Sequence, residues 1–213
     1  MKLVDHLTIA STSLEAGARD VERALGVSLL EGGKHPRMGT HNRLLRLGDQ
    51  VYLELIAIDP VGSPPGRPRW FGLDAPATRS QLAPGPRLLH WVVRRESTGL
   101  PALPFAPGPW EPFERGPFRW RLTVRDDGSL PADGIVPSLI CWDGPAHPAA
   151  HLPDSGCTLE ALELEHPRAA EVQDQLNALG LPHRCAPGPV PRLTAHLRTP
   201  GGPRTLRSTE PVR

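Results

Sequence analysis

Glu54 is the residue of this chain whose type and position most clearly suggest chemistry. It lies in the middle of residues 51–58, VYLELIAI, and both of its neighbours in the chain are leucines. The β-branched and aromatic residues of this segment predict a strand, and carboxylates are almost never buried unless they are paired or bind a metal. Two interpretations stay open from the pattern: Glu54 faces solvent on a half-exposed sheet, or it faces a positive group inside the protein.

His6 is the second candidate, because it lies in a segment that alternates polar and apolar residues. Residues 3–10, LVDHLTIA, predict a strand with one mainly apolar face, which also carries Asp5, and one mixed face, which carries His6. His6 could serve as a ligand or pocket residue, or it could be a histidine satisfied within the sheet.

A third group of candidates lies in residues 32–42, where a Gly-rich stretch is predicted to form a turn ahead of a strand. This stretch carries His35 and His41, followed by Asn42. Such side chains can line the mouth of a pocket and donate hydrogen bonds to a carbonyl or carboxylate of a substrate. Alternatively, His41 and Asn42 cap the backbone groups of their own loop.

The elements that must position these candidates follow the order strand–helix–strand–strand–strand over residues 1–58. Ser13 and Gly26 are predicted to cap a helix, because apolar residues between them recur at helical spacing. The strands are expected at residues 3–10, 27–30, 42–47 and 51–58. Gly48 marks a turn between the last two of them.

A similar but degraded unit is predicted over residues 87–145, after a connector rich in Pro, Gly and Arg at residues 59–86. Its strands are expected at residues 87–94, 118–124 and 137–142. Pro101 and Pro104 argue against a regular helix where a repeat of the first unit would place one. The connector is longer than most loops, so it is either functional or a linker.

Residues 157–208 predict a further unit with the order strand–helix–strand–strand. The helix is expected over residues 167–180, with a proline in its first turn and a glycine at its end. The unit has few polar groups suited to chemistry. We therefore expect it to extend the sheet or to cover one of its edges.

The composition restricts the class of protein. The chain has 213 residues and a net charge of +1, so no long-range field favours nucleic acid or an anionic membrane. Its three cysteines lack a CxxC pattern, so neither a zinc knuckle nor a disulfide framework is expected. No signal segment is found, nor an apolar run of the ~18 residues that a membrane span needs. These features predict a cytoplasmic protein.

The order βαβββ, with His in its first strand and Glu in its last, resembles the vicinal oxygen chelate superfamily, in which two such modules curl their sheets around a shared cavity. The stretch GGKHPRMGTHNRLLRLGDQVYLELIAI at residues 32–58 is similar to the glyoxalase-like domain group. The resemblance covers residues 1–145. It implies an α+β fold: paired βαβββ modules that form a curved mixed sheet around a cavity, with a C-terminal βαββ extension.

Carried over residue by residue, the resemblance implies a divalent metal held by His6, Glu54 and His90, because LLHW in the second unit echoes VDHL in the first. The fourth ligand position falls near Cys141, where the superfamily usually has a carboxylate. A thiolate there would favour softer metals such as zinc and make iron-dependent ring cleavage a poorer fit. The expected ion is Zn, Ni, Mn or Fe, and no nucleotide cofactor is expected.

The resemblance leaves two functions open. One is a metal-dependent lyase or isomerase of the glyoxalase type that acts on vicinal oxygens, with Glu54 also shuttling protons. The other is a metal-free protein that binds or sequesters a small molecule. The substrate is expected to contact His35, His41, Asn42, Trp91 and Trp120. Strict alternation, however, puts Trp91 and its neighbour His90 on opposite faces. The expected partner is a small-molecule ligand, and a homodimer is left open.

Overall fold

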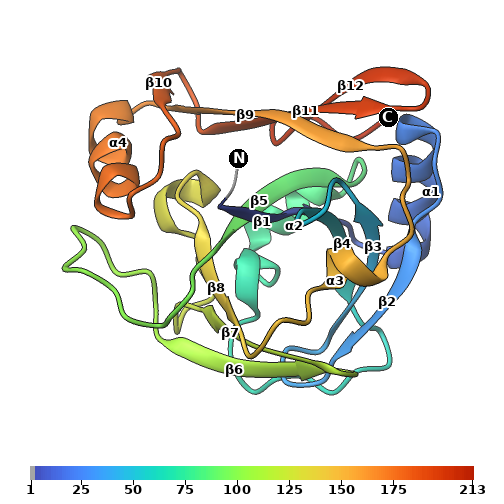
Figure 1. Ribbon diagram of the computed structural model, residues 1–213, viewed down its shortest axis with the longest axis horizontal. Helices are drawn as coiled ribbons and strands as arrows, with labels where there is room; N and C mark the ends of the chain where they lie inside the picture. The colour runs from blue at the N-terminus through green and yellow to red at the C-terminus, as the bar shows by residue number, and fades with distance from the viewer. Residues whose placement is uncertain (1–2) are drawn as a thin grey trace.

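Two β-sheets, stacked as layers, form the framework of the protein (Figure 1). The computed structural model describes residues 3–213. The larger sheet has eight strands in the order β2-β3-β4-β1-β5-β8-β7-β6. These strands are β1 (Val4–Ala10), β2 (Leu30–His35), β3 (Thr40–Arg46), β4 (Tyr52–Ile58), β5 (Arg87–Arg94), β6 (Trp110–Arg115), β7 (Phe118–Thr123) and β8 (Ser138–Trp142).

The eight-stranded sheet consists of two halves with the same topology. β1 and β4 pair in parallel in the first half, as β5 and β8 do in the second. β1 and β5 join the halves as antiparallel neighbours. The sheet curls until its edge strands β2 and β6 contact each other. This arrangement confirms the predicted fold class of paired βαβββ modules in a curved mixed sheet.

The curl gives the sheet an inner face, which surrounds the cavity, and an outer face. β4 alternates between them: Tyr52, Glu54 and Ile56 point to the inner face, and the leucines between them point to the outer face. Helix α1 (Leu14–Leu25) packs on the outer face through its apolar stripe. The outer side of β4 therefore belongs to a core that α1 covers, and its inner side is available for a site.

Helix α1 begins and ends where the sequence predicts. The side chain of Ser13 accepts a hydrogen bond from the backbone N–H of Ala16 at 3.3 Å. Gly26 follows the helix with a left-handed φ of 72°, and its N–H donates to the carbonyl of Glu22 at 2.8 Å. A glycine takes this conformation without the steric cost of a Cβ.

The Gly-rich stretch differs from its prediction, because it is a strand rather than a turn. The predicted short strand Val27–Leu30 is wrong, since β2 begins at Leu30 and continues through the glycines to His35. The turn follows at residues 36–39.

Side chains that pass close over β2 explain its glycines. A Cβ on Gly32 would lie 2.1 Å from Oδ1 of Asn42, and a Cβ on Gly33 would lie 2.8 Å from Cδ of Arg115. Gly33 also has a φ of 155°, which L side chains rarely adopt. The glycines therefore provide room for side chains at the inner face, not a reversal of the chain.

The connector between the two halves covers part of the inner face. It contains the 3-10 turn η1 (Trp70–Gly72) and helix α2 (Pro76–Leu82). Trp70 and Phe71 are buried and pack with inner-face residues of the sheet. The sequence left two roles open for the connector, a functional segment or a linker. In the structure, the connector supplies part of the cavity wall.

The second half has no helix between β5 and β6, as its prolines predict. Residues 95–109 form neither helix nor strand, and the short 3-10 turn η2 (Pro131–Gly134) precedes β8. β6 was not predicted, because Pro112 lies within it. Proline is tolerated there because β6 is an edge strand, where one side of the backbone needs no ladder hydrogen bond.

The C-terminal unit forms a second sheet that covers the outer face. Its elements are β9 (Thr158–His166), α4 (Ala169–Ala178), β10 (Cys185–Pro187), β11 (Arg192–Thr199) and β12 (Gly202–Arg207). The strand order is β10-β9-β11-β12, so β10 is an addition to the predicted order. β11 and β12 contact β5, and Leu197 belongs to the same core as Trp91. The unit covers a face of the main sheet rather than extending it or covering an edge.

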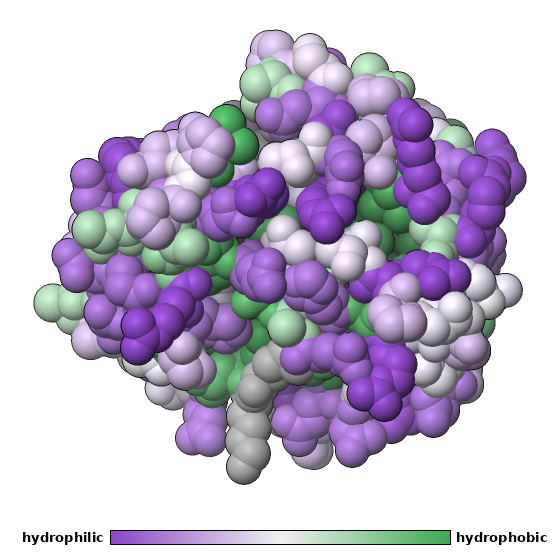
Figure 2. Space-filling model, turned by 90° about the horizontal axis from the view of Figure 1, so that it is seen from above, coloured by the Kyte–Doolittle hydropathy of each residue, from purple (hydrophilic) through white to green (hydrophobic). Residues whose placement is uncertain are grey.

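The exterior of this layer is mainly hydrophilic, with small hydrophobic areas between the polar side chains (Figure 2). None of the helices within residues 3–213 is long and apolar enough to cross a membrane.

Removing the side chain of Leu197 is expected to destabilise the whole protein, because it is 1 % exposed between the two layers. We expect Leu197→Ala to lower the free energy of unfolding by about 2–5 kcal/mol. The matched control is Leu30→Ala, at a leucine that is 39 % exposed. Urea unfolding followed by circular dichroism measures both. Equal effects of the two substitutions would contradict the packing described here.

Candidate functional site

His6 and Glu54 meet on the inner face of the sheet. They lie on the neighbouring parallel strands β1 and β4, and Thr8 pairs with Glu54 in the register. His6 Nε2 lies 3.7 Å from Glu54 Oε2. The two residues are 4 % and 6 % exposed, so Glu54 is not on a solvent-facing side of the sheet.

A buried carboxylate behind His6 holds the imidazole in place. The strand pairing of β1 is irregular between Val4 and His6, and this irregularity lets Asp5 reach its neighbour's ring. Asp5 Oδ1 lies 2.8 Å from His6 Nδ1. In a regular strand, adjacent side chains point to opposite faces, so the bulge is what makes this contact possible.

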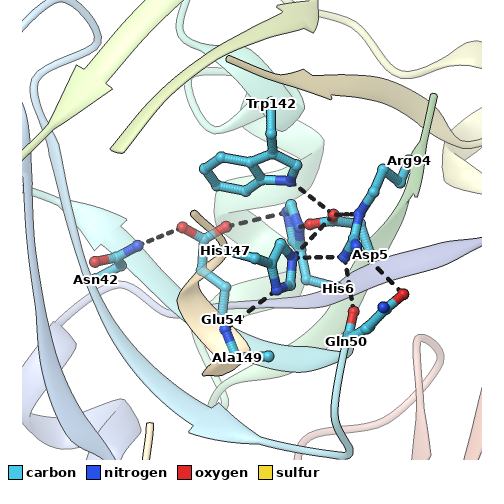
Figure 3. A network of polar contacts seen from close by, with 9 residues as sticks. All are labelled: Asp5, His6, Asn42, Gln50, Glu54, Arg94, Trp142, His147 and Ala149. Carbon is cyan, nitrogen blue, oxygen red and sulfur yellow. Dashed lines mark hydrogen bonds and ion pairs between the residues drawn. The ribbon is translucent and has the colours of Figure 1, made fainter. Parts of the chain in front are cut away.

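Asp5 is the centre of a hydrogen-bond network (Figure 3). Its Oδ2 accepts from Arg94 Nε at 2.8 Å, Trp142 Nε1 at 2.9 Å and His147 Nε2 at 3.1 Å. Burial by itself would raise the pKa of Asp5, but the hydrogen bonds from His147 and His6 hold that pKa far below its usual value. Asp5 is therefore an ionised carboxylate, which can only accept hydrogen bonds.

The ionised Asp5 decides which nitrogen of His6 faces the cavity. Because the carboxylate is an acceptor, Nδ1 of His6 must carry the proton that is shared with it. Nε2 is then directed toward Glu54. The ring also stacks on Tyr52, with ring centroids 4.7 Å apart and an interplanar angle of 21°. Two contacts thus fix the orientation of this imidazole.

Glu54 is held from its other side by Asn42 on the neighbouring strand β3. The Asn42 side-chain amide donates to Glu54 Oε1 at 2.5 Å. Arg115 Nη1 in turn donates to Asn42 Oδ1 at 3.0 Å, which fixes the orientation of the amide. Arg115 and Asn42 can approach in this way because β2 has glycines where they pass.

His35 lies on the inner face as an uncharged residue. Its Nδ1 is 3.1 Å from Thr40 Oγ1, and its ring makes edge contacts with Trp70 and Trp120. Burial, with a smaller contribution from the positive charge of Arg115, lowers the pKa of His35 to about 3. His35 is therefore a neutral hydrogen-bonding group near physiological pH.

Aromatic side chains form most of the remaining cavity wall. They belong to Tyr52, Trp70, Phe71, Trp120 and Trp142. The free space between them is about 20 Å³, which holds about one water molecule. Two larger hollows adjoin it. A groove of about 690 Å³ shares Arg115 with the cavity, and a second hollow of about 380 Å³ shares His35 and Trp120. Only a small group can therefore reach His6 and Glu54.

His90 lies on the inner face, but its ring is fully used by the protein. Nδ1 lies 3.0 Å from the carbonyl of Gly134, and Nε2 accepts from the backbone N–H of Ser138, also at 3.0 Å. Burial lowers its pKa to about 3. With one nitrogen donating and the other accepting, neither is available to a metal ion.

Cys141 lies on the outer face, opposite to His6 and Glu54. In the pairing of β7 with β8, Trp120 pairs with Trp142, Arg121 with Cys141 and Leu122 with Ile140. Trp120, Leu122, Ile140 and Trp142 line the cavity, so alternation turns Cys141 away from it. The inner-face positions of β8 nearest to the predicted fourth ligand are thus apolar.

Trp91 and His41 also lie outside the cavity lining, contrary to their predicted role as substrate contacts. Trp91 is 0 % exposed on the outer face, where Nε1 donates to the carbonyl of Ile135 at 2.9 Å and its ring contacts His183. His41 pairs with the outer-face residue Ala57. Of the predicted substrate contacts, His35 and Trp120 line the cavity, and Asn42 reaches it through Glu54.

The donor set that the resemblance implies for a metal does not come together on the inner face. Within residues 3–213, no group of three or more His, Cys, Asp or Glu side chains is positioned to hold a metal ion. His6 and Glu54 are adjacent, but both nitrogens of His90 are engaged. The residues present therefore do not fit the predicted set of three.

Sequence reasoning missed several residues that organise this site, which are Asp5, Arg94, Arg115, Trp142 and His147. The adjacency of Asp5 and His6 was a visible signal, but the rule of strand alternation argued against their contact. The others come from strands and loops far from His6 in the chain. No local spacing could have identified them.

Comparison with known proteins agrees with this architecture. A family model described as "Glyoxalase-like domain" matches residues 4–180. The crystal structure of a hypothetical protein from Staphylococcus aureus has a TM-score of 0.60 at 15 % identity, over 88 % of this chain and 87 % of that chain. At that identity the likeness shows the fold alone.

Two methylmalonyl-CoA epimerase structures are more distant. The Streptomyces coelicolor enzyme, in complex with 2-nitronate-propionyl-CoA, has 17 % identity and a TM-score of 0.40, over 67 % of this chain and 98 % of that chain. A complex with methylmalonyl-CoA and NH4+ has 17 % identity and a TM-score of 0.41, over 68 % and 98 %. A search of curated proteins found no match.

The burial of His35 and His90 predicts that acid destabilises the protein. Each has a pKa lowered to about 3 by burial, whereas an unfolded histidine has a pKa of about 6.5. The unfolded chain therefore binds more protons between these values. The free energy of unfolding should fall as the pH falls through this window, by up to about 1.4 kcal/mol per pH unit for each histidine.

Denaturant unfolding between about pH 7 and pH 5, where most carboxylates stay ionised, measures this slope. We expect His35→Gln or His90→Gln to flatten it, and the exposed His151→Gln to leave it unchanged. An unaltered slope in both buried variants would contradict the assignment of these rings as neutral.

Proposed function

This chain belongs to the glyoxalase-like domain family, and on that premise we propose that it binds a small oxygen-containing molecule at the sheet-lined cavity, where His6 and Glu54 exchange protons with it. The observation that carries the proposal is the placement of His6 Nε2 at 3.7 Å from Glu54 Oε2 in the lining of the cavity. Such a pair suits an isomerase or a lyase that moves a proton at a carbon next to a carbonyl group.

The two groups differ in a way that supports proton exchange. His6 has Asp5 at its back, so a proton taken up at Nε2 would produce an imidazolium that the carboxylate stabilises. Glu54 has the Asn42 amide at one oxygen, while its other oxygen faces His6. One group can accept a proton from the ligand while the other returns a proton, provided that the ligand places its reacting atom within hydrogen-bond reach of both.

The aromatic walls of the cavity provide surroundings that favour this chemistry. Trp120, Trp142 and Phe71 leave room beside the pair for about one water molecule, and charges interact more strongly where little water is present. A planar or apolar body of the ligand could instead lie in the adjoining hollow of about 380 Å³, which Trp120 and Phe113 line.

A metal-dependent reaction on vicinal oxygens is the second candidate. Two observations favour it: His6 and Glu54 present adjacent donor atoms, and Asp5 contacts the other ring nitrogen, as carboxylates often do behind metal-binding histidines. Zn, Ni, Mn or Fe would be the ion. We rank this candidate lower because the cavity supplies only two of the three predicted protein ligands, since both ring nitrogens of His90 are engaged.

The remaining alternative from the sequence is a metal-free protein that binds or sequesters a small molecule. Such a protein would use the same cavity, but it would not need proton exchange. A cytoplasmic location, a homodimer and the lack of a nucleotide cofactor stay predictions from the sequence.

Proton exchange can be tested without knowledge of the natural substrate. A panel of 2-hydroxy and 2-oxo acids, ketones and aldehydes in D₂O is followed by NMR for deuterium uptake at carbon. We expect the wild type to accelerate uptake for at least one compound, and Glu54→Gln and His6→Asn to lower that rate about 10²- to 10⁴-fold. Glu114→Gln, at an exposed carboxylate, is the matched control. Equal rates in all four proteins would overturn the proposal.

Elemental analysis separates the two catalytic candidates. We expect purified wild-type protein to contain metal at well below one equivalent, and the exchange rate to survive dialysis against a chelator. Stoichiometric metal that is lost in both His6→Ala and Glu54→Gln would instead establish the second candidate, since each variant removes one adjacent donor atom.

A further inference from the structure

We propose that Arg115 binds the negatively charged group of the ligand, so that the ligand is a small 2-hydroxy or 2-oxo carboxylate. This inference rests on the proposed function, because it takes the cavity of His6 and Glu54 as the place of reaction. It adds the substrate class and a residue that determines specificity.

Arg115 stands where the outside groove meets the inner cavity. It is the last residue of the edge strand β6, and it lines both the cavity of about 20 Å³ and the groove of about 690 Å³. Its side chain passes over Gly33 of the opposite edge strand, where a Cβ would lie 2.8 Å from Arg115 Cδ. A ligand that extends from the groove toward Glu54 would therefore lie beside the Arg115 side chain.

The guanidinium group has unused capacity for hydrogen bonds. It carries five N–H donors, and within residues 3–213 its one side-chain hydrogen bond is from Nη1 to Asn42 Oδ1. Other arginines around the cavity have carboxylate partners: Arg94 has Asp5 and Arg119 has Glu114. Among the described residues, no carboxylate lies within salt-bridge distance of Arg115.

The charge of Arg115 also acts inside the site. After burial, it is the largest cause of the lowered pKa of the neighbouring His35. A positive group that lacks an anionic partner at the mouth of a partly buried site favours an anion. Arginine matches a carboxylate in particular, because two parallel N–H groups can bind its two oxygens.

The contacts that link Arg115 to Glu54 indicate how far the charged group of the ligand lies from the ligand atom that reacts. Arg115 contacts Asn42, and Asn42 contacts Glu54, at 3.0 and 2.5 Å. One amide group thus separates the anion-binding group from the proton acceptor. The space beside Glu54 admits only a few atoms, so a reacting carbon directly attached to the carboxylate fits best. A larger substituent of such an acid can lie in the groove.

Matched pairs of acids and amides test this inference. The probes are lactate, pyruvate, mandelate and benzoylformate, each compared with its primary amide, and binding is followed through tryptophan fluorescence at constant ionic strength. We expect at least one acid to bind the wild type more tightly than its amide. Arg115→Gln should weaken the binding of that acid about 10- to 100-fold and leave the binding of its amide nearly unchanged.

Two further variants separate charge recognition from a general effect on the fold. Arg115→Lys keeps the charge without the planar donor group, so we expect it to restore part of the preference for the acid. Arg23→Gln removes an exposed arginine of α1 that lines neither the groove nor the cavity, and we expect it to leave the preference unchanged.

The outcomes distinguish this inference from the proposed function. If no acid binds more tightly than its amide, or if Arg115→Gln keeps the full preference, the role of Arg115 is overturned. The proposed function stands in that case if Glu54→Gln still abolishes deuterium uptake. If the preference for the acid is present and depends on Arg115, but Glu54→Gln leaves the uptake unchanged, the site binds carboxylates and the proton exchange is overturned.

Discussion

The burial of the Asp5 carboxylate is the constraint on which the site depends. Asp5 is 0 % exposed, and an ionised group in such a place is strongly unfavourable unless several donors compensate it. Here it accepts hydrogen bonds from His6, Arg94, Trp142 and His147. These donors come from β1, β5, β8 and the segment that follows β8, so one carboxylate ties both halves of the sheet together and at the same time sets the proton position on His6.

Glu54 is also a buried carboxylate, but fewer hydrogen-bond donors surround it than surround Asp5. The two carboxylates therefore have different tasks. Asp5 is surrounded by donors on all sides and stays ionised. Glu54 has Asn42 at one oxygen and only the more distant His6 at the other. The first carboxylate is therefore a fixed structural charge. The second keeps an oxygen that a ligand can reach, which is what a group that exchanges protons needs.

The two halves of the sheet repeat the same topology, but their side chains have diverged. His6 and His90 lie in corresponding strands. His6 has a carboxylate on one side and the cavity on the other, whereas the ring of His90 is closed in by Gly134 and Ser138. The inner-face positions of β8 are apolar where β4 has Glu54. The resemblance in topology thus predicted a symmetric set of ligands, while the second half serves as a wall of the cavity.

The sequence by itself determined part of the elements, and its resemblance to a family predicted the fold class. Local patterns and caps located β1, α1 and β4, and alternation correctly put His6 and Glu54 on faces that could meet, because side-chain direction in a regular strand has a fixed period. Only the tertiary structure decided the rest. A bulge at Asp5 brings neighbouring residues together against that period, and curling of the sheet brings Arg115 across Gly33 from a strand 82 positions later in the chain (115 − 33). Contacts of this kind depend on the closure of the whole sheet, which no local pattern records.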